Sequence, residues 1–192
     1  PHLSWYQLTI EPNTAFGARP PRLPEDDTLW EIQEQGHALL EAAGYRQYEI
    51  SAYAKPGFEC QHNLNYWRFG DYIGIGCGAH GKVTFPDGRI LRTTKTRHPR
   101  GFMQGRYLES QRDVEAADKP FEFFMNRFRL LEAAPRAEFA LYTGLPESVI
   151  RPQIDEALAQ GYLTECAEYW QITEHGKLFL NSLLELFLAD DS

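Results

Sequence analysis

The stretch from Pro56 to Gly81 constrains the fold more than any other, because it joins a dense group of polar and aromatic residues to a glycine-rich run. Four of the eight residues from Gly74 to Gly81 are glycine. So many glycines lose much chain entropy on folding, and we therefore expect the main chain here to pass close to a bound group or to the rim of a sheet. Just before them, a His-Asn-x-x-Tyr-Trp pattern runs from His62 to Trp67.

The glycine run is similar to a dinucleotide-binding loop only in composition. A Rossmann fingerprint follows the first strand, opens a long helix and precedes an acid about 20 residues further on. Here the residues after Gly81 have the pattern of a hairpin around Pro86-Asp87-Gly88, and no such acid follows. We therefore exclude nucleotide binding of the Rossmann kind.

Two interpretations of His62 are open. In the first, Asn63 stabilises a loop, Tyr66 and Trp67 fill the core, and His62 is an ordinary hydrogen-bonded side chain. In the second, His62 is an axial ligand to a haem iron, and Tyr66 and Trp67 provide a stacking surface. His80, which lies between glycines, is a second candidate ligand.

The order of the expected elements predicts two domains, residues 1–118 and 119–192. The first opens with a strand from His2 to Ile10, a helix after Pro24 that ends at Gly44, and a strand from Tyr48 to Ala52. Strand, helix and strand in succession are typical of an α/β unit. Residues 93–117 carry no clear period, so we expect loop with some helix there.

The second expected domain has the element order of a winged helix. The pattern predicts three helices, a short hairpin from Leu163 to Ile172, and a last helix capped by Thr173. The third of these helices would enter a DNA groove, yet it carries one cation among three acids: Arg151 with Glu147, Asp155 and Glu156. Because duplex binding requires several cations to neutralise phosphates, we exclude nucleic acid as a partner.

The charge is uneven along the chain, whose net charge is −8. Lys82 to Arg106 holds seven cationic residues and one acid, whereas Phe121 to Ser192 holds five cationic residues and twelve acids. We expect the basic segment to be solvated surface, or to pair with propionates or another acidic partner. Since no apolar run could cross a bilayer and no signal peptide is visible, we expect a cytoplasmic protein without a transmembrane segment.

The three cysteines do not form a recognisable metal or redox motif. Cys60, Cys77 and Cys166 are 17 and 89 positions apart, which matches no zinc, iron–sulfur or thiol-redox spacing, so we expect free thiols. The first residue is Pro1 and the sequence begins directly with strand-like character. We therefore expect the chain to be a piece of a longer protein.

Several segments together resemble the radical-SAM haem chaperones, a family long labelled oxygen-independent coproporphyrinogen III oxidase-like proteins. The segments that carry the resemblance are 7–14, 48–57, 62–67, 74–81 and 121–130. It implies an α/β plus α+β fold, in which a partial (β/α) barrel with a 4Fe-4S cluster on Cys-x-x-x-Cys-x-x-Cys and bound S-adenosylmethionine precedes a small C-terminal domain. Since no cysteines here have that spacing, the chain is similar to the C-terminal part and is expected to be inactive in radical chemistry.

The resemblance also implies site residues. The family's haem-binding signature falls on His62, Asn63, Tyr66 and Trp67. In related barrel enzymes, the loop after the sixth strand and a glycine-rich segment touch S-adenosylmethionine. On this sequence those positions are Thr9, Ile10, Glu11, Gly76, Gly78 and His80.

For the whole protein, the resemblance implies binding of haem and its delivery to acceptor apoproteins such as respiratory haem proteins. An enzyme alternative is the oxidative decarboxylation of coproporphyrinogen III. A third alternative is an interaction module, in which the last domain contacts a partner or covers the barrel mouth. The full-length protein could also form a homodimer, and it could contact a membrane peripherally through its acceptor proteins.

Overall fold

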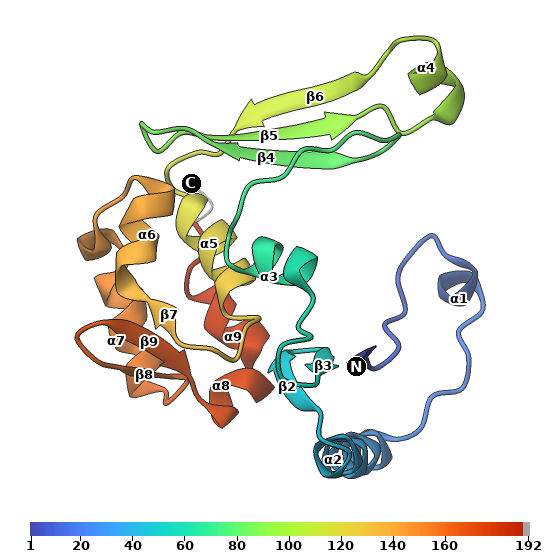
Figure 1. Ribbon diagram of the computed structural model, residues 1–192, viewed down its shortest axis with the longest axis vertical. Coiled ribbons are helices and arrows are strands. Elements are labelled where there is room, and N and C mark those ends of the chain that lie inside the picture. Colours follow the sequence, from blue (N-terminus) through green and yellow to red (C-terminus); the bar gives the residue numbers. More distant parts are fainter. Residues whose placement is uncertain (190–192) are drawn as a thin grey trace. The chain divides into compact units, whose positions relative to one another are not determined.

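The computed structural model describes residues 1–189 and has a mixed α/β architecture (Figure 1). Its contacts group the chain into two compact units, Pro1–Cys60 and Gln61–Ser192. The domain boundary expected after residue 118 stays a prediction. Among residues 1–189, every helix is too short or too polar to span a bilayer.

The first unit contains a three-stranded antiparallel sheet in the order β1-β3-β2 and two helices. Gly44, with φ +82°, ends the longer helix as expected. The elements of this unit are β1 (His2–Ser4), α1 (Ala15–Ala18), α2 (Asp26–Ala42), β2 (Arg46–Glu49) and β3 (Ala52–Ala54).

Both strands expected in this unit have different bounds. The strand predicted from His2 to Ile10 ends at Ser4, because its partner β3 begins at Ala52, the residue opposite Ser4. Beyond this point the strand would have no neighbour to pair with, and Tyr6 and Leu8 are exposed. The strand predicted from Tyr48 to Ala52 is two strands, which turn at residues 50–51 and pair with each other.

The second unit begins with α3 and a three-stranded antiparallel sheet in the order β4-β5-β6. The predicted hairpin around Pro86–Gly88 is confirmed, with Thr84 opposite Ile90. The sheet extends away from the helices of this unit and carries α4 at its far end (Figure 1). The bounds are α3 (Gln61–Trp67), β4 (His80–Thr84), β5 (Ile90–Lys95), α4 (Pro99–Met103) and β6 (Leu108–Asp113).

Strand β6 lies within the segment where we expected only loop and some helix, so that prediction is wrong for Leu108–Asp113. Every residue of β6 is exposed and most are polar. A strand that buries neither face has no period-2 alternation of apolar residues. Its main chain nevertheless pairs with β5, with Gln111 opposite Thr93.

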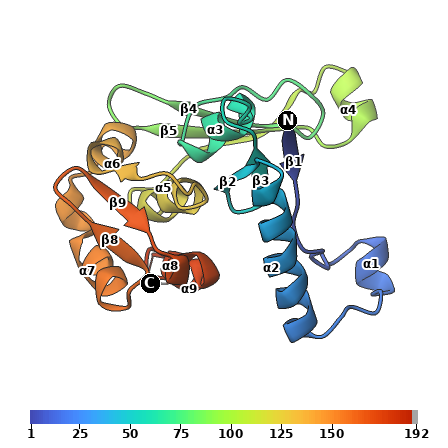
Figure 2. The same ribbon diagram turned by 60° about the horizontal axis from the view of Figure 1, so that its bottom comes forward.

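The rest of the second unit is a helical layer around a small sheet in the order β7-β9-β8 (Figure 2). The predicted three helices, hairpin and last helix are present, and the last helix is broken at Phe179. The elements are α5 (Lys119–Arg127), β7 (Ala134–Pro135), α6 (Arg136–Thr143), a 3₁₀ helix (Glu147–Val149), α7 (Arg151–Ala159), β8 (Leu163–Glu165), β9 (Tyr169–Ile172), α8 (Glu174–Leu178) and α9 (Leu180–Glu185).

Phe124 of α5 is at the centre of the core of this layer and is fully buried. Its ring centroid lies 4.2 Å from that of Phe187, 4.7 Å from Phe128 and 5.7 Å from Trp170. Phe128 follows the last residue of α5, Trp170 lies in the hairpin, and Phe187 follows α9. Aromatic packing therefore joins the first and last parts of the layer.

Two glycines join the β4–β5 turn to the end of α6. Gly88 and Gly144 both have positive φ angles, +80° and +70°. A Cβ on Gly88 would lie 2.7 Å from the Cα of Gly144. Lys119 completes the contact, because its Nζ donates to the carbonyl oxygens of Gly88 (2.7 Å) and Thr143 (2.9 Å). The sheet and the helical layer thus meet through main-chain atoms.

Replacing Gly88 by alanine should lower the free energy of unfolding by about 2 kcal/mol, since it adds backbone strain and an overlap with Gly144. Gly105→Ala is the matched control: Gly105 has φ +88°, but a Cβ added there would have open space around it within residues 1–189. It should lose only about 1 kcal/mol. Urea unfolding followed by circular dichroism measures both, and equal losses would contradict the importance of the glycine contact.

Candidate functional site

The His-Asn-x-x-Tyr-Trp motif lies on the short helix α3. The helix ends where Phe69 takes a left-handed conformation, with φ +62°, and Gly70 donates its N–H to the Asn65 carbonyl (2.7 Å). The Asn65 side chain donates to the Asp71 carbonyl (3.0 Å) and fixes the chain beyond the helix. Within the first interpretation of His62, the loop role of Asn63 is therefore wrong, because this residue is helical. The choice between the two interpretations of His62 stays open.

His62 and Tyr66 are one helical turn apart and share a face of α3. Their ring centroids are 4.6 Å apart, and the rings meet edge to face at 80°. His62 is exposed, and residues 1–189 provide no hydrogen-bond partner for its ring nitrogens. Tyr66 also packs against Tyr72, with a centroid separation of 4.3 Å. The imidazole is thus exposed and packs against the Tyr66 ring, and its role as a ligand stays a prediction.

Trp67 lies about 100° further round the helix and has different surroundings. The Arg129 guanidinium carbon lies 4.5 Å from the centroid of its indole. The indole Nε1 is buried without a hydrogen-bond partner in the described part of the chain. Trp67 lines a cavity of about 570 Å³ together with apolar side chains that include Phe121, Met125 and Leu184. The predicted joint stacking role of Tyr66 and Trp67 stays a prediction.

A second cavity, of about 550 Å³, lies beside Tyr72 and includes His80, the other candidate ligand. The Tyr72 hydroxyl accepts a hydrogen bond from Arg92 (2.9 Å), and Arg92 also donates to Glu122 (2.9 Å). His80 Nδ1 lies 3.4 Å from the Thr94 hydroxyl. The Tyr66–Tyr72 contact therefore links the surroundings of His62 to a cavity that contains a second imidazole.

The glycine run is partly explained by its approach to this sheet. Tyr72 forms an isolated bridge with Lys82, and a Cβ on Gly74 would overlap the His80 carbonyl. Close approach to the rim of a sheet, one of the two expected explanations, therefore accounts for Gly74. Gly76 has open space beside it, and contact of Gly76, Gly78 and His80 with S-adenosylmethionine stays a prediction.

Lys82 is a structural residue that the sequence did not reveal, and the expectation that it lies on a solvated surface is wrong. Lys82 is 1% exposed. Its Nζ donates hydrogen bonds to Asp71 Oδ1, the Phe69 carbonyl and the Thr84 hydroxyl, each at 2.9 Å. Burial lowers the pKa of Lys82, and the hydrogen bond with Asp71 offsets part of this effect. The ammonium holds the segment after α3 against β4.

Arg68 connects α3 to the helical layer. Its guanidinium donates two hydrogen bonds to the Glu132 carboxylate, at 2.9 and 2.7 Å. Glu132 also accepts from the buried Arg127 (3.0 Å). The hydrogen bond from Arg68 is the main reason why the pKa of Glu132 is below its usual value. The helix that carries His62 is thus fixed by an ion-pair network as well as by packing.

The residues present do not fit an iron–sulfur cluster. Cys60 is half-buried, Cys77 and Cys166 are exposed, and all three are free. Residues 1–189 contain no group of three or more His, Cys, Asp or Glu side chains that could hold a metal ion. Thr9, Ile10 and Glu11 belong to the first unit, in the loop between β1 and α1, and their predicted contact with S-adenosylmethionine stays a prediction.

Comparison with known proteins defines the class first. Residues 114–179 match the family model described as the HemN C-terminal domain. A solved structure of the coproporphyrinogen III oxidase HemN from Escherichia coli, a radical SAM enzyme, superposes with a TM-score of 0.70 at 15% identity. The match covers 97% of this chain and 47% of that one. This chain therefore has the fold of about half of HemN.

Sequence relatives narrow this class to one family. The heme chaperone HemW of Escherichia coli is 88% identical over 99% of this chain and 50% of its own length. HemW of Haemophilus influenzae is 66% identical over 100% of this chain and 50% of its own length. HemW of Mycobacterium tuberculosis is 31% identical over 98% of this chain and 47% of its own length. The chain thus spans about half the length of the curated relatives it matches. The predicted resemblance to the C-terminal part of the radical-SAM haem chaperone family is confirmed.

Proposed function

We propose that this chain is the C-terminal part of a haem chaperone that binds haem and passes it to acceptor haem proteins. The observation that carries the proposal is the 88% identity to a heme chaperone over 99% of the chain. The geometry of α3 supports it, since His62 has an exposed imidazole against an aromatic ring. Haem is the cargo in this proposal.

The side chains around α3 have distinct roles in this proposal. A nitrogen of His62 binds the haem iron, and Tyr66, which Tyr72 supports from behind, holds the imidazole in place. Asn63 and Trp67 complete the binding surface. Trp67 brings an apolar face and an indole N–H that still lacks an acceptor within residues 1–189. Tetrapyrrole binding would draw on such apolar and aromatic surfaces.

The finer assignment of the fold also belongs to this proposal. The first strands and helices are the last elements of a partial radical-SAM barrel, and residues 119–192 are a winged-helix-like domain. The order of three helices, a hairpin and a further helix supports the second assignment. Within this domain Arg151 pairs with Asp155 (2.7 Å) and Glu165 (2.7 Å), so the third helix presents no cationic face to nucleic acid within the described residues.

The full-length protein would act in the cytoplasm, with respiratory haem proteins as acceptors. Its 4Fe-4S cluster and S-adenosylmethionine would be bound largely by residues that this chain does not include, with Thr9–Glu11 and Gly76–His80 at the edge of the S-adenosylmethionine site. A homodimer and membrane contact through the acceptors are compatible with this role. Oxidation of coproporphyrinogen III is not proposed, because likeness to that enzyme at 15% identity concerns the fold alone.

Replacing His62 by alanine should weaken haem binding by about tenfold or more and should change the position of the Soret band, because the iron loses its imidazole ligand. Titration of the 192-residue chain with haemin, followed by absorbance, measures both. His175→Ala is the control, since this exposed histidine lies on α8 and stacks on Tyr162, outside the motif. An unchanged Soret band and an unchanged haemin affinity in His62→Ala would show that His62 does not bind the haem iron.

A further inference from the structure

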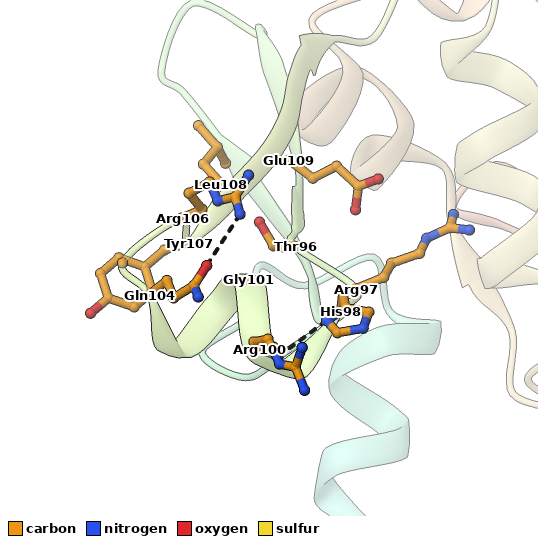
Figure 3. A pocket seen from close by; sticks show the side chains of 11 residues that line it. Thr96, Arg97, His98, Arg100, Gly101, Gln104, Arg106, Tyr107, Leu108 and Glu109 are labelled. Carbon is orange, nitrogen blue, oxygen red and sulfur yellow. Dashed lines mark hydrogen bonds between the residues drawn. The ribbon is translucent and has the colours of Figure 1, made fainter.

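A basic pocket lies at the far end of the β4-β5-β6 sheet, around α4 (Figure 3). It has a volume of about 760 Å³ and is formed by one continuous segment, residues 96–109. Hydrogen bonds hold the segment in shape: Thr96 donates its N–H to the Tyr107 carbonyl (3.1 Å), and Arg106 donates to that of Gly101 (3.3 Å). In Figure 3, Arg106 and Arg100 lie on either side of Gly101.

The arginines of this pocket differ from the others in the same unit because they lack acidic partners. Between residues 61 and 189, most arginines form an ion pair with Asp or Glu, and Arg129 lies over Trp67. Within that range, Arg97, Arg100 and Arg106 form no ion pair, and all three line the pocket. Among the described residues, the only acid in its lining is Glu109. Three uncompensated guanidinium groups on one open pocket attract anions.

The histidine of the pocket adds a further hydrogen-bond donor. His98 Nδ1 accepts the N–H of Arg100 (3.2 Å) and caps α4. The proton of the neutral ring therefore resides on Nε2, which leaves an N–H for a ligand. Arginine forks and an imidazole N–H are suited to carboxylate oxygens.

The rim of the pocket favours a protein segment over a small enclosed ligand. Tyr107, 56% exposed, packs its ring against Phe102, and Met103, the next residue of α4 after Phe102, is 81% exposed. Arginine, tyrosine and methionine are enriched in protein interfaces, whereas lysine and glutamate are depleted. Residues 96–108 contain no lysine and no acid. Arg106 donates a hydrogen bond to Gln104 Oε1 (3.2 Å), so these guanidinium groups lack acidic partners but not every contact. Their combination with exposed apolar side chains is typical of a docking surface.

We propose that the pocket around α4 is a docking site for an acidic segment of a partner protein, whose carboxylates bind Arg97, Arg100 and Arg106 and whose neighbouring apolar side chain contacts Tyr107 and Met103. This site is separate from α3 and does not depend on the proposed haem binding. The net charge of −8 makes nonspecific attraction of an acidic peptide to this chain unfavourable. Binding of such a peptide would therefore identify the pocket.

The probe is a short fluorescein-labelled peptide in which glutamates surround a leucine, and its control is the same peptide with glutamine in place of glutamate. Fluorescence anisotropy with the 192-residue chain at low salt measures binding. Arg97→Gln with Arg100→Gln should weaken binding of the acidic peptide by about tenfold or more. The matched control is Arg19→Gln with Arg22→Gln, which removes the same charge from exposed arginines in the first unit and should leave binding within about twofold.

Three outcomes would overturn the proposal. Equal binding of the glutamine peptide would show that carboxylates are not recognised. An equal loss of peptide binding in both double variants would show that the pocket is not the binding site. If the acidic peptide fails to bind while inorganic phosphate or phosphatidylglycerol vesicles bind in an Arg97- and Arg100-dependent way, the site recognises a phosphoryl group and not a protein segment. Haemin titration of the same variants should be unchanged, which separates this test from that of His62.

Discussion

Phe124→Ala should lower the free energy of unfolding of the second unit by about 3–5 kcal/mol. Phe124 has no exposed surface and touches rings from the hairpin and from the residues after α9. The substitution removes this apolar surface and leaves a cavity between elements that are fixed from several sides, so the core cannot close around it. Urea unfolding followed by circular dichroism at several protein concentrations gives the loss.

The matched control for this core substitution is Leu141→Ala on α6. Leu141 is 72% exposed in the same unit, and its replacement should change stability by about 0.5 kcal/mol at most. Because the chain has two compact units, two transitions are expected, and only the one that belongs to Gln61–Ser192 should move. A loss for Phe124→Ala no greater than that of Leu141→Ala would show that the aromatic cluster does not hold this unit together.

Asp71→Ala should cost about 2–3 kcal/mol, because it leaves the ammonium of Lys82 buried without its carboxylate. The effect is smaller than for a fully buried pair, since the Asp71 side chain is 42% exposed whereas that of Lys82 is 2% exposed. The loss also includes the hydrogen bond that Asp71 Oδ2 accepts from the Thr84 N–H (2.8 Å). Thermal and urea unfolding measure the difference from the unsubstituted chain.

A double-mutant cycle separates the buried charge from the other contacts of Asp71. Lys82→Met in the Asp71→Ala background should recover part of the lost stability, because methionine needs no carboxylate. Asp113→Ala is the control, since this half-exposed acid lies 3.6 Å from the half-exposed Arg89, and its removal should cost at most about 1 kcal/mol. If the double variant is less stable than Asp71→Ala, the unpaired ammonium is not the cause of the loss.

The pH dependence of the Asp71→Ala effect follows from the pKa of the carboxyl. Burial alone would raise the pKa of Asp71, but the hydrogen bonds from Thr84 and Lys82 outweigh it and lower the pKa below its ordinary value. A carboxyl with a lowered folded pKa stabilises the fold fully above its unfolded pKa, near pH 4, and loses this contribution as the pH falls through the folded value. The stability difference between the two chains should therefore shrink below about pH 4.

Helices and strands were predicted well from the sequence where one buried face produces a regular spacing of apolar residues. The helices after Lys119 have apolar residues at helical spacing, and the hairpin around Pro86–Gly88 has the residues that form turns. Both signals can be recognised in the local sequence. β6 could not be found, because it buries no face and its pairing with β5 is made by main-chain atoms. The end of β1 was also missed, since it depends on where β3 begins, which is a property of the partner strand.

For the candidate site, the motif identified the candidate residues but not the faces of the helix on which they lie. Spacing on a helix would have separated His62 and Tyr66 from Trp67, but this requires knowing that residues 61–67 are helical. Their polar and aromatic composition carries no clear helical period. The Asp71–Lys82 pair left no local signal either, because 11 positions of loop and glycine run separate its members. Burial of a lysine becomes visible only when tertiary contacts are known.

The position of Lys82 has a consequence for chemical modification of the protein. Acylating reagents attack neutral amines that they can reach, and the nitrogen of Lys82 is enclosed by Phe69, Asp71 and Thr84. Lys55, by contrast, is exposed to water. The reactivity of Lys82 relative to Lys55 therefore reports how often β4 separates from the chain that follows α3, at a single residue and without denaturant.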